Sequence, residues 1–197
     1  MRPKFPTDER KARIREVLSR RQPDLTLVLN NIHDPHNVSA ILRSCDAFGV
    51  FGVHLLYTSE VFPTLGHKSS ASARKWIQTE CHADPASLAG RLHRDGFSVL
   101  ATGFSPRSAP LNEINFTRPT AVILGNEHRG VDPEFAPLVD GEIFIPMQGM
   151  VQSLNVSVAA ALILYEAWRQ RSAAGFFDRP RFDAQDMETL FEEWCQI

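Results

Sequence analysis

Short apolar runs recur along most of this chain, and several are separated from the next by a segment with helical character. The runs expected to form strands are residues 25–30, 52–57, 97–101, 120–124 and 142–145, with a shorter one at 76–80. Helices are expected at residues 37–48, 85–95, 133–139 and 153–172. Strands that alternate with helices are typical of an α/β fold built around a mostly parallel sheet. For the helix over residues 37–48 we expect Asn37 to be the N-cap and Gly49 to follow the C-terminal end.

The length of 197 residues suits one domain with short additions at its ends. We expect a basic helical extension over residues 1–22, one α/β domain over 23–172, and a linker with a terminal helix over 173–197. The longest apolar run, residues 158–165, is too short to cross a bilayer. Three cysteines without metal-like spacing, and no apolar signal segment near Met1, favour a cytoplasmic protein.

The two ends of the chain carry opposite charges, although the net charge of the whole is only −2. Residues 1–21 hold eight Arg and Lys side chains against three acids, whereas residues 183–197 hold five acids and no base. Such asymmetry favours a basic arm that binds an anionic partner. A helix face that is simply solvated is the alternative.

The first polar segment after an expected strand is NNIHDPHNVSAILR, residues 30–43. Parallel α/β sheets bind ligands at the carboxyl ends of their strands, so this segment is a candidate site. Arg43 lies about 200° around the helix from the apolar Ile41 and therefore projects away from the core. Near a helix N-terminus it could hold an anion, and an ordinary exposed arginine is the alternative.

Two further loops after strands combine glycine with polar side chains. LGNEHRG, residues 124–130, allows close backbone approach by a ligand and offers Asn126 and Glu127, although a plain turn would have the same composition. IPMQGMVQSLN, residues 145–155, mixes apolar and polar residues in a way that suits a flat, partly apolar ligand. The alternative is that its apolar residues only fasten the loop to the core.

Common nucleotide-binding and metal-binding patterns are absent from the sequence. No G-x-G-x-x-G follows the first strand, and there is no G-x-x-x-x-G-K-[ST], which disfavours Rossmann methyltransferases, dehydrogenases and P-loop enzymes. The seven histidines form no H-E-x-x-H pattern, and the pair His33 and His36 lacks a third ligand. We therefore expect no metal.

Together, the three polar segments resemble a known family. NNIHDPHNVSAILRSCDAFGV, AVILGNEHRGV and IPMQGMVQSLNVSVAAALILYEA are similar, in order and spacing, to the three motifs of the SpoU/TrmH branch of the SPOUT methyltransferases. The resemblance covers roughly residues 25–171. The arginine-rich opening that ends in RRQPDLTL resembles, within this branch, the enzymes that act on the ribose of guanosine 18 in tRNA.

The resemblance implies a SPOUT fold with a mostly parallel sheet and a deep C-terminal trefoil knot, a homodimer, and S-adenosylmethionine as methyl donor. By motif position, the catalytic residues are expected to be Asn37, Arg43, Glu127, Ser153 and Asn155. The methyl donor is expected to lie against Thr102, Leu124, Gly125, Ile145, Met147 and Leu154. RNA contacts are expected from Arg10, Arg13, Arg20, Arg21 and Arg169.

The function that the resemblance implies is methylation of the 2'-hydroxyl of the D-loop guanosine, position 18, of tRNA. The alternatives are ribose methylation at the wobble base or in rRNA, and an RNA-binding protein that keeps the fold without catalysis. An arginine is a poor general base because its guanidinium stays protonated at neutral pH, so we expect Arg43 to hold the adjacent phosphate and stabilise the developing alkoxide. The acidic segment 183–197 departs from relatives with a basic C-terminal extension, so RNA contact from this end is not expected.

Overall fold

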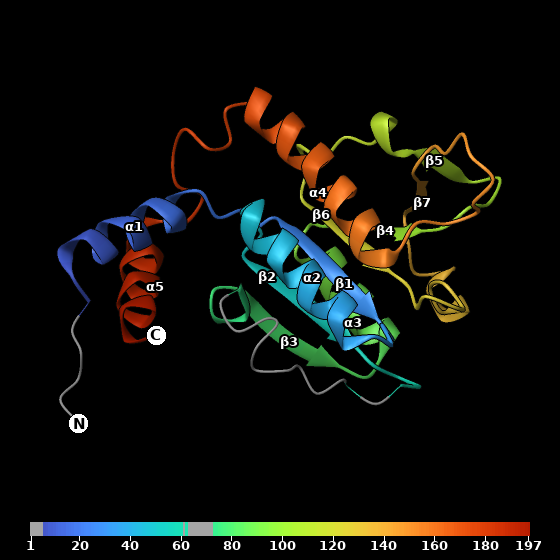
Figure 1. Ribbon diagram of the computed structural model, residues 1–197, viewed down its shortest axis with the longest axis horizontal. Coiled ribbons are helices and arrows are strands. Elements are labelled where there is room, and N and C mark those ends of the chain that lie inside the picture. Colours follow the sequence, from blue (N-terminus) through green and yellow to red (C-terminus); the bar gives the residue numbers. More distant parts are fainter. Residues whose placement is uncertain (1–5, 61, 63–72) are drawn as a thin grey trace.

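A computed structural model describes residues 6–60, 62 and 73–197, and its centre is a seven-stranded sheet (Figure 1). The strand order is β3-β2-β1-β6-β4-β7-β5, and every neighbouring pair of named strands is parallel. The strands are β1 (Leu25–Asn30), β2 (Gly52–Leu56), β3 (Gln78–His82), β4 (Ser98–Thr102), β5 (Ser108–Pro110), β6 (Thr120–Leu124) and β7 (Gly141–Phe144). The α/β class with a parallel sheet is confirmed.

Five α-helices accompany the sheet in the described part of the chain. They are α1 (Asp8–Ser19), α2 (Pro35–Ala47), α3 (Pro85–Arg94), α4 (Val156–Ala173) and α5 (Ala184–Gln196). The described part of the chain also contains three short 3-10 turns: η1 (Ala73–Lys75), η2 (Leu111–Glu113) and η3 (Pro133–Phe135). None of the helices in this part of the chain is long and apolar enough to span a bilayer.

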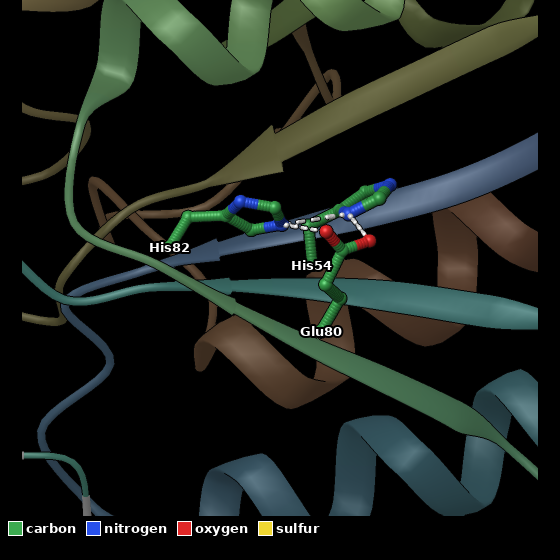
Figure 2. A group of neighbouring side chains, drawn as sticks. All are labelled: His54, Glu80 and His82. Carbon is green, nitrogen blue, oxygen red and sulfur yellow. Dashed lines mark hydrogen bonds and ion pairs between the residues drawn. The ribbon is translucent and has the colours of Figure 1, made fainter.

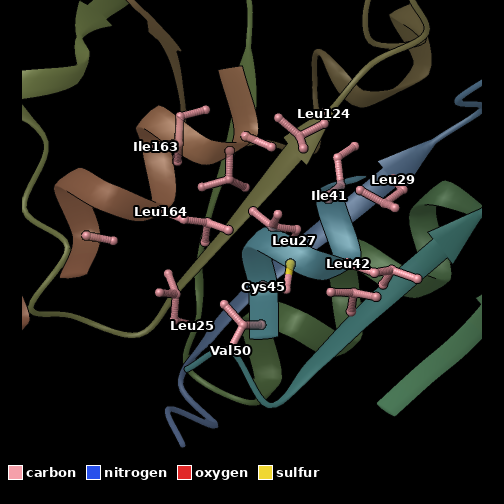
Figure 3. Packing of buried hydrophobic residues seen from close by; sticks show 14 of the residues in the cluster. Leu25, Leu27, Leu29, Ile41, Leu42, Cys45, Val50, Leu124, Ile163 and Leu164 are labelled. Atoms are coloured by element: carbon pink, nitrogen blue, oxygen red, sulfur yellow. The ribbon is translucent and has the colours of Figure 1, made fainter. Parts of the chain in front are cut away.

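The interior strand β1 is buried along its whole length because helices cover both faces of the sheet. Alternate side chains point to opposite faces, so Leu27 joins the core under α2 and α4, whereas Val28 joins the core under α3. Figure 3 shows the first of these cores, in which Ile41 of α2 and Leu164 of α4 meet the β1 leucines. The largest apolar cluster thus fixes α2 and α4 against each other at the centre of the sheet.

The predicted strands 25–30 and 120–124 are confirmed residue for residue, and the other strands shift by one or two positions. Helix α2 differs more, since Asp34 is its N-cap and Pro35 opens its first turn. The prediction that Asn37 caps this helix is therefore wrong. Asn37 lies inside the first turn with its side chain buried, whereas Gly49 follows the helix with a positive φ of 81° as expected.

Two other segments differ from the sequence prediction. Helix α4 begins at Val156 rather than at residue 153, because the side chain of Asn155 accepts a hydrogen bond from the Ser157 N–H and caps it. The predicted helix 133–139 is reduced to the 3-10 turn η3. The connection between β4 and β6 contains the edge strand β5 and the turn η2, neither of which was among the expected elements.

The two ends of the described chain pack against each other beside the sheet (Figure 1). Leu18 of α1 and Trp194 of α5 belong to one apolar cluster, which accounts for the apolar face that the terminal helix carries. Across the surface, Arg15 forms a two-bond ion pair with Glu188 and stacks over the ring of Phe191. The basic and acidic termini therefore make one helical pair.

Candidate active site

The carboxyl ends of four neighbouring strands, β1, β6, β4 and β7, meet at one edge of the sheet. The loop after β6 turns so tightly that a Cβ placed on Gly125 would lie 2.1 Å from the backbone of Gly130 and Val131. Only glycine fits at position 125. The turn is closed by two backbone hydrogen bonds of 2.9 Å between Asn126 and Gly130, and it points Glu127 toward the start of α2.

The carboxylate of Glu127 holds the segment between β1 and α2. It accepts hydrogen bonds from the backbone N–H of His33 at 2.9 Å, from the N–H of Asp34 at 3.2 Å, and from Nδ2 of Asn37 at 2.7 Å. Burial raises the pKa of Glu127, but the bonds from Asn37 and from the His33 N–H outweigh it, and the pKa is lowered overall. The Glu127 carboxylate is thus an anion that accepts hydrogen bonds. Its lowered pKa makes it a poor general base at neutral pH.

Asn37 links Glu127 to the third polar segment. Its Oδ1 accepts a hydrogen bond of 3.0 Å from Nδ2 of Asn155, the residue that caps α4. These bonds fix the orientation of both side-chain amides. Nδ2 of Asn37 donates to Glu127, and Nδ2 of Asn155 donates to Asn37. The three segments that the sequence singled out separately meet in one connected network.

The other two expected catalytic residues lie on the exposed surface near this network. Arg43 is exposed on α2, about 9 Å along the helix axis from Asn37. Ser153 is exposed in the loop that leads into α4.

The residues expected to contact a methyl donor lie at the ends of three adjacent strands. Thr102 ends β4 and donates from Oγ1 to the carbonyl of Ile123 at 3.0 Å. Leu124 ends β6 and Gly125 follows it, and Ile145 and Met147 follow β7. Leu154 stands just before α4 and is partly buried. Apolar side chains protrude here, with Phe104 86% exposed and Met150 100% exposed. The exposed Phe104, two residues after the end of β4, was not among the residues expected from the sequence.

Comparison with known proteins decides the family. The sequence profile described as SpoU rRNA Methylase family matches residues 24–165. A Thermus thermophilus protein named tRNA (guanosine(18)-2'-O)-methyltransferase is 48% identical over 190 residues, which cover 96% of this chain and 97% of that protein. The chain belongs to the SpoU methylase family.

Solved structures of the SpoU family agree with this assignment. The Aquifex aeolicus TrmH/SpoU tRNA modifying enzyme superposes with a TM-score of 0.89 at 37% identity, covering 95% of each chain. The SpoU methyltransferase AviRb from Streptomyces viridochromogenes, solved with AdoMet, superposes with a TM-score of 0.68 at 25% identity, over 79% of this chain and 62% of that one.

The structure separates the arginines expected to contact RNA. Arg10, Arg13, Arg20 and Arg169 are exposed, and three of them form surface ion pairs with a nearby glutamate. Arg21 is 0% exposed, because its guanidinium binds the Asp46 carboxylate and the carbonyl of Val50. The prediction that Arg21 contacts RNA is therefore corrected: in this SpoU-family chain it joins α1 to α2. Arg171 is buried in the same way against Asp24.

Proposed function

We propose that this chain is an S-adenosylmethionine-dependent tRNA 2'-O-methyltransferase that methylates the ribose of guanosine 18 in the D-loop. The observation that carries this assignment is the 48% identity, over nearly the whole of both chains, to a protein named for that activity. The three-segment network of Glu127, Asn37 and Asn155 supports it, because three of the five residues implied by the family motifs are joined by hydrogen bonds at one edge of the sheet.

The residues at the ends of β6, β4 and β7 fit S-adenosylmethionine. Strand order and register bring Thr102 and Gly125 to the same edge, and the exposed apolar side chains Phe104, Met147 and Met150 offer cover for a flat adenine ring. When bound, the sulfonium supplies an electrophilic methyl group for in-line displacement.

Arg43 and the asparagine network have different tasks in this proposal. The guanidinium of Arg43 binds the phosphate next to the target ribose and stabilises the alkoxide that develops at the 2'-oxygen as its proton passes to solvent water. Asn37 and Asn155 hold the start of α2 and the cap of α4 in place at the site, and Ser153 offers a hydroxyl to the ribose. Much of the rate then comes from holding the 2'-hydroxyl in line with the donor.

Glu127 acts as a positioning residue. Three donors already occupy its carboxylate, and its pKa is lowered, so it does not take the proton of the 2'-hydroxyl. Its negative charge instead sets the path of the segment from His33 to Asn37. Loss of Glu127 is expected to displace that segment rather than to remove a reacting group.

We propose that tRNA binds across the exposed arginines of α1 and α4, namely Arg10, Arg13, Arg20 and Arg169. Residues 23–172 then form the methyltransferase domain, and residues 1–22 form the basic extension that reaches the substrate. Residues 173–197 supply the helix that braces this extension, since α5 packs on α1.

We also propose that the enzyme is a homodimer through α4. Val158, Leu162, Tyr165 and Trp168 recur along this helix at spacings of three and four, and each is 38–50% exposed. A large apolar stripe on a charged surface marks a protein–protein contact. A second copy of this chain is a suitable cover, since a twofold interface pairs one patch with itself.

A deep trefoil knot in the C-terminal part of the chain is a further proposal. Family membership supports it, as does the position of β7, which inserts between β4 and the earlier edge strand β5. Tracing the backbone of residues 98–173 in an experimental structure would check whether the chain passes through its own loop.

Methyl transfer from radiolabelled S-adenosylmethionine tests the function. Unmodified tRNA transcript should be labelled at one nucleotide, and a transcript with 2'-deoxyguanosine at position 18 should not, because it lacks the acceptor hydroxyl. Label at another tRNA or rRNA ribose would overturn the assignment of the target. Absence of label in any RNA would favour a protein that binds RNA without catalysis.

A further inference from the structure

Three side chains capable of metal ligation converge on the edge pair β2–β3, on the side of the sheet that α3 covers (Figure 2). The parallel register pairs His54 with Glu80 and Leu56 with His82. Glu80 and His82 are two residues apart on one strand, so their side chains share a face. His54 projects from the same face of the neighbouring strand, and Figure 2 shows the three groups pointing toward one another.

The distances between the ligand atoms suit a small cation. Nδ1 of His54 lies 3.1 Å from Nε2 of His82, and the Glu80 carboxylate oxygens lie 3.9 Å from the former and 3.8 Å from the latter. Zinc–ligand bonds of about 2.0–2.2 Å in a tetrahedron separate neighbouring ligand atoms by about 3.3–3.6 Å. One ligand atom from each residue lies within 4.8 Å of the other two, so shifts on the order of one ångström would bring all three to bonding distance of one ion.

A positively charged group already contacts all three residues. The guanidinium of Arg91, from α3, binds both oxygens of Glu80. Its Nη2 lies 3.2 Å from Nδ1 of His54 and 3.5 Å from Nε2 of His82. The cluster is thus arranged around a cation, and a metal ion would bind by displacing this guanidinium toward solvent.

The cluster can be reached from outside the protein. His54, Glu80 and Arg91 line an open hollow of about 670 Å³. The two histidine side chains are only 16% and 14% exposed, whereas Glu80 is 54% exposed. Two imidazoles held by a sheet and one carboxylate at the solvent boundary form a ligand set that zinc accepts, with water at the fourth position.

We propose that His54, Glu80 and His82 form a binding site for a divalent transition-metal ion, Zn²⁺ in the first instance, which ties the edge strand β3 to β2. The site is separate from the proposed active site, which lies at the carboxyl ends of β1, β6, β4 and β7. Because an ion that binds only the folded state adds to its stability, metal would raise the melting temperature. Arg91 competes with the ion for the same three groups.

Zinc binding to the untagged, chelator-treated full chain tests this site. Equilibrium dialysis with ZnCl₂ and metal analysis should give one ion per chain, and binding should tighten in Arg91→Gln, where the competing guanidinium is absent. In the Arg91→Gln background, His82→Ala should weaken binding at least about tenfold, since even changes outside the ligand shell cost that much. Co²⁺ in place of zinc should give the intense visible bands of a four-coordinate site.

Two matched controls keep the result specific. Cys81→Ser should leave binding unchanged, because Cys81 lies between Glu80 and His82 and points to the opposite face of β3. His93→Ala removes an exposed histidine that pairs with Asp140 outside the cluster and should also have no effect. The proposal is overturned if neither the parent chain nor Arg91→Gln binds one zinc ion, or if binding in Arg91→Gln survives His82→Ala.

Discussion

The Nδ2 atom of Asn37 lies 2.7 Å from Oε1 of Glu127, and this hydrogen bond joins two residues that are 90 positions apart in the chain. The same Asn37 side chain accepts a bond from Asn155, 118 positions away. One amide thereby connects the start of α2, the turn after β6 and the cap of α4.

Replacing Asn37 with alanine should weaken both stability and activity. It removes a donor to a charged carboxylate, a hydrogen bond worth about 1.5–3 kcal/mol, and it leaves Nδ2 of Asn155 without its acceptor. Urea unfolding monitored by circular dichroism measures the first effect, and methyl transfer to tRNA measures the second. Asn112→Ala, at an exposed asparagine of η2, is the control and should change neither. Unchanged stability in Asn37→Ala would mean that the network does not hold the site together.

The lowered pKa of Glu127 predicts a specific pH dependence of folding. Its folded pKa lies below the unfolded value of about 4.3, so its contribution is fully present above that pH and is lost as the pH falls through the folded pKa. The difference in unfolding free energy between the parent chain and Glu127→Gln should therefore be constant above about pH 5 and shrink below about pH 4.3. A difference that does not change between pH 3 and pH 6 would contradict this.

Arg43 should tolerate neither loss of charge nor loss of its planar fork. Arg43→Ala is expected to lower kcat by a factor on the order of 10²–10³, as removal of one stabilising donor does elsewhere. Arg43→Lys keeps the charge but cannot make two parallel bonds to a phosphate, and should recover only part of the rate. Single-turnover kinetics with saturating donor would measure both. Near-full activity in Arg43→Lys would argue against bidentate phosphate binding.

The exposed arginines of α1 should set the salt dependence of tRNA binding. Removing one arginine–phosphate interaction flattens the slope of log K against log salt by about 0.7–0.9, so Arg10→Gln with Arg13→Gln should reduce it by up to about 1.4–1.8. Filter binding between low and physiological salt measures the slope. Arg94→Gln, at an exposed arginine of α3, should leave it as in the parent chain. An unchanged slope in the double variant would exclude α1 from the RNA surface.

Arg21→Gln should behave differently from these surface variants. Its guanidinium is buried on Asp46, and breaking a buried pair costs up to about 3–5 kcal/mol. We therefore expect a marked fall in unfolding free energy, measured in urea. The folded fraction should bind tRNA with the same salt dependence as the parent chain. A variant of full stability with a flatter slope would restore Arg21 to the RNA-binding set.

The homodimer proposal predicts that charge on the α4 stripe separates the subunits. Leu162→Arg places a guanidinium among the side chains of Val158, Tyr165 and Trp168, where a partner helix would bury it. Sedimentation equilibrium should show the parent chain at twice the monomer mass and the variant as a monomer. Ile197→Arg, at an exposed apolar residue near the C-terminus, should remain dimeric. A monomeric parent chain would end the proposal.

Local patterns predicted the sheet well because strands 25–30 and 120–124 are short, apolar and flanked by clear helix signals. Helix starts were harder to predict. Asp34 and Asn155 are the actual caps, but Asn37 and Ser153 have equally suitable side chains, and only the tertiary partner decides which one caps. Asn37 lies inside the helix, where its side-chain amide donates a hydrogen bond to Glu127.

The sequence by itself determined the α/β class, the three polar segments and the family, because these depend on residue order and on contiguous motifs. The tertiary structure decided which charges are available. Arg10 and Arg21 look alike in the sequence, yet one is exposed and the other is buried on Asp46. The tertiary structure also decided that His54 and His82 lie next to each other, because only the register of β2 and β3 brings them together. The physical reason is that burial and strand register arise from packing between distant segments, which local spacing does not encode.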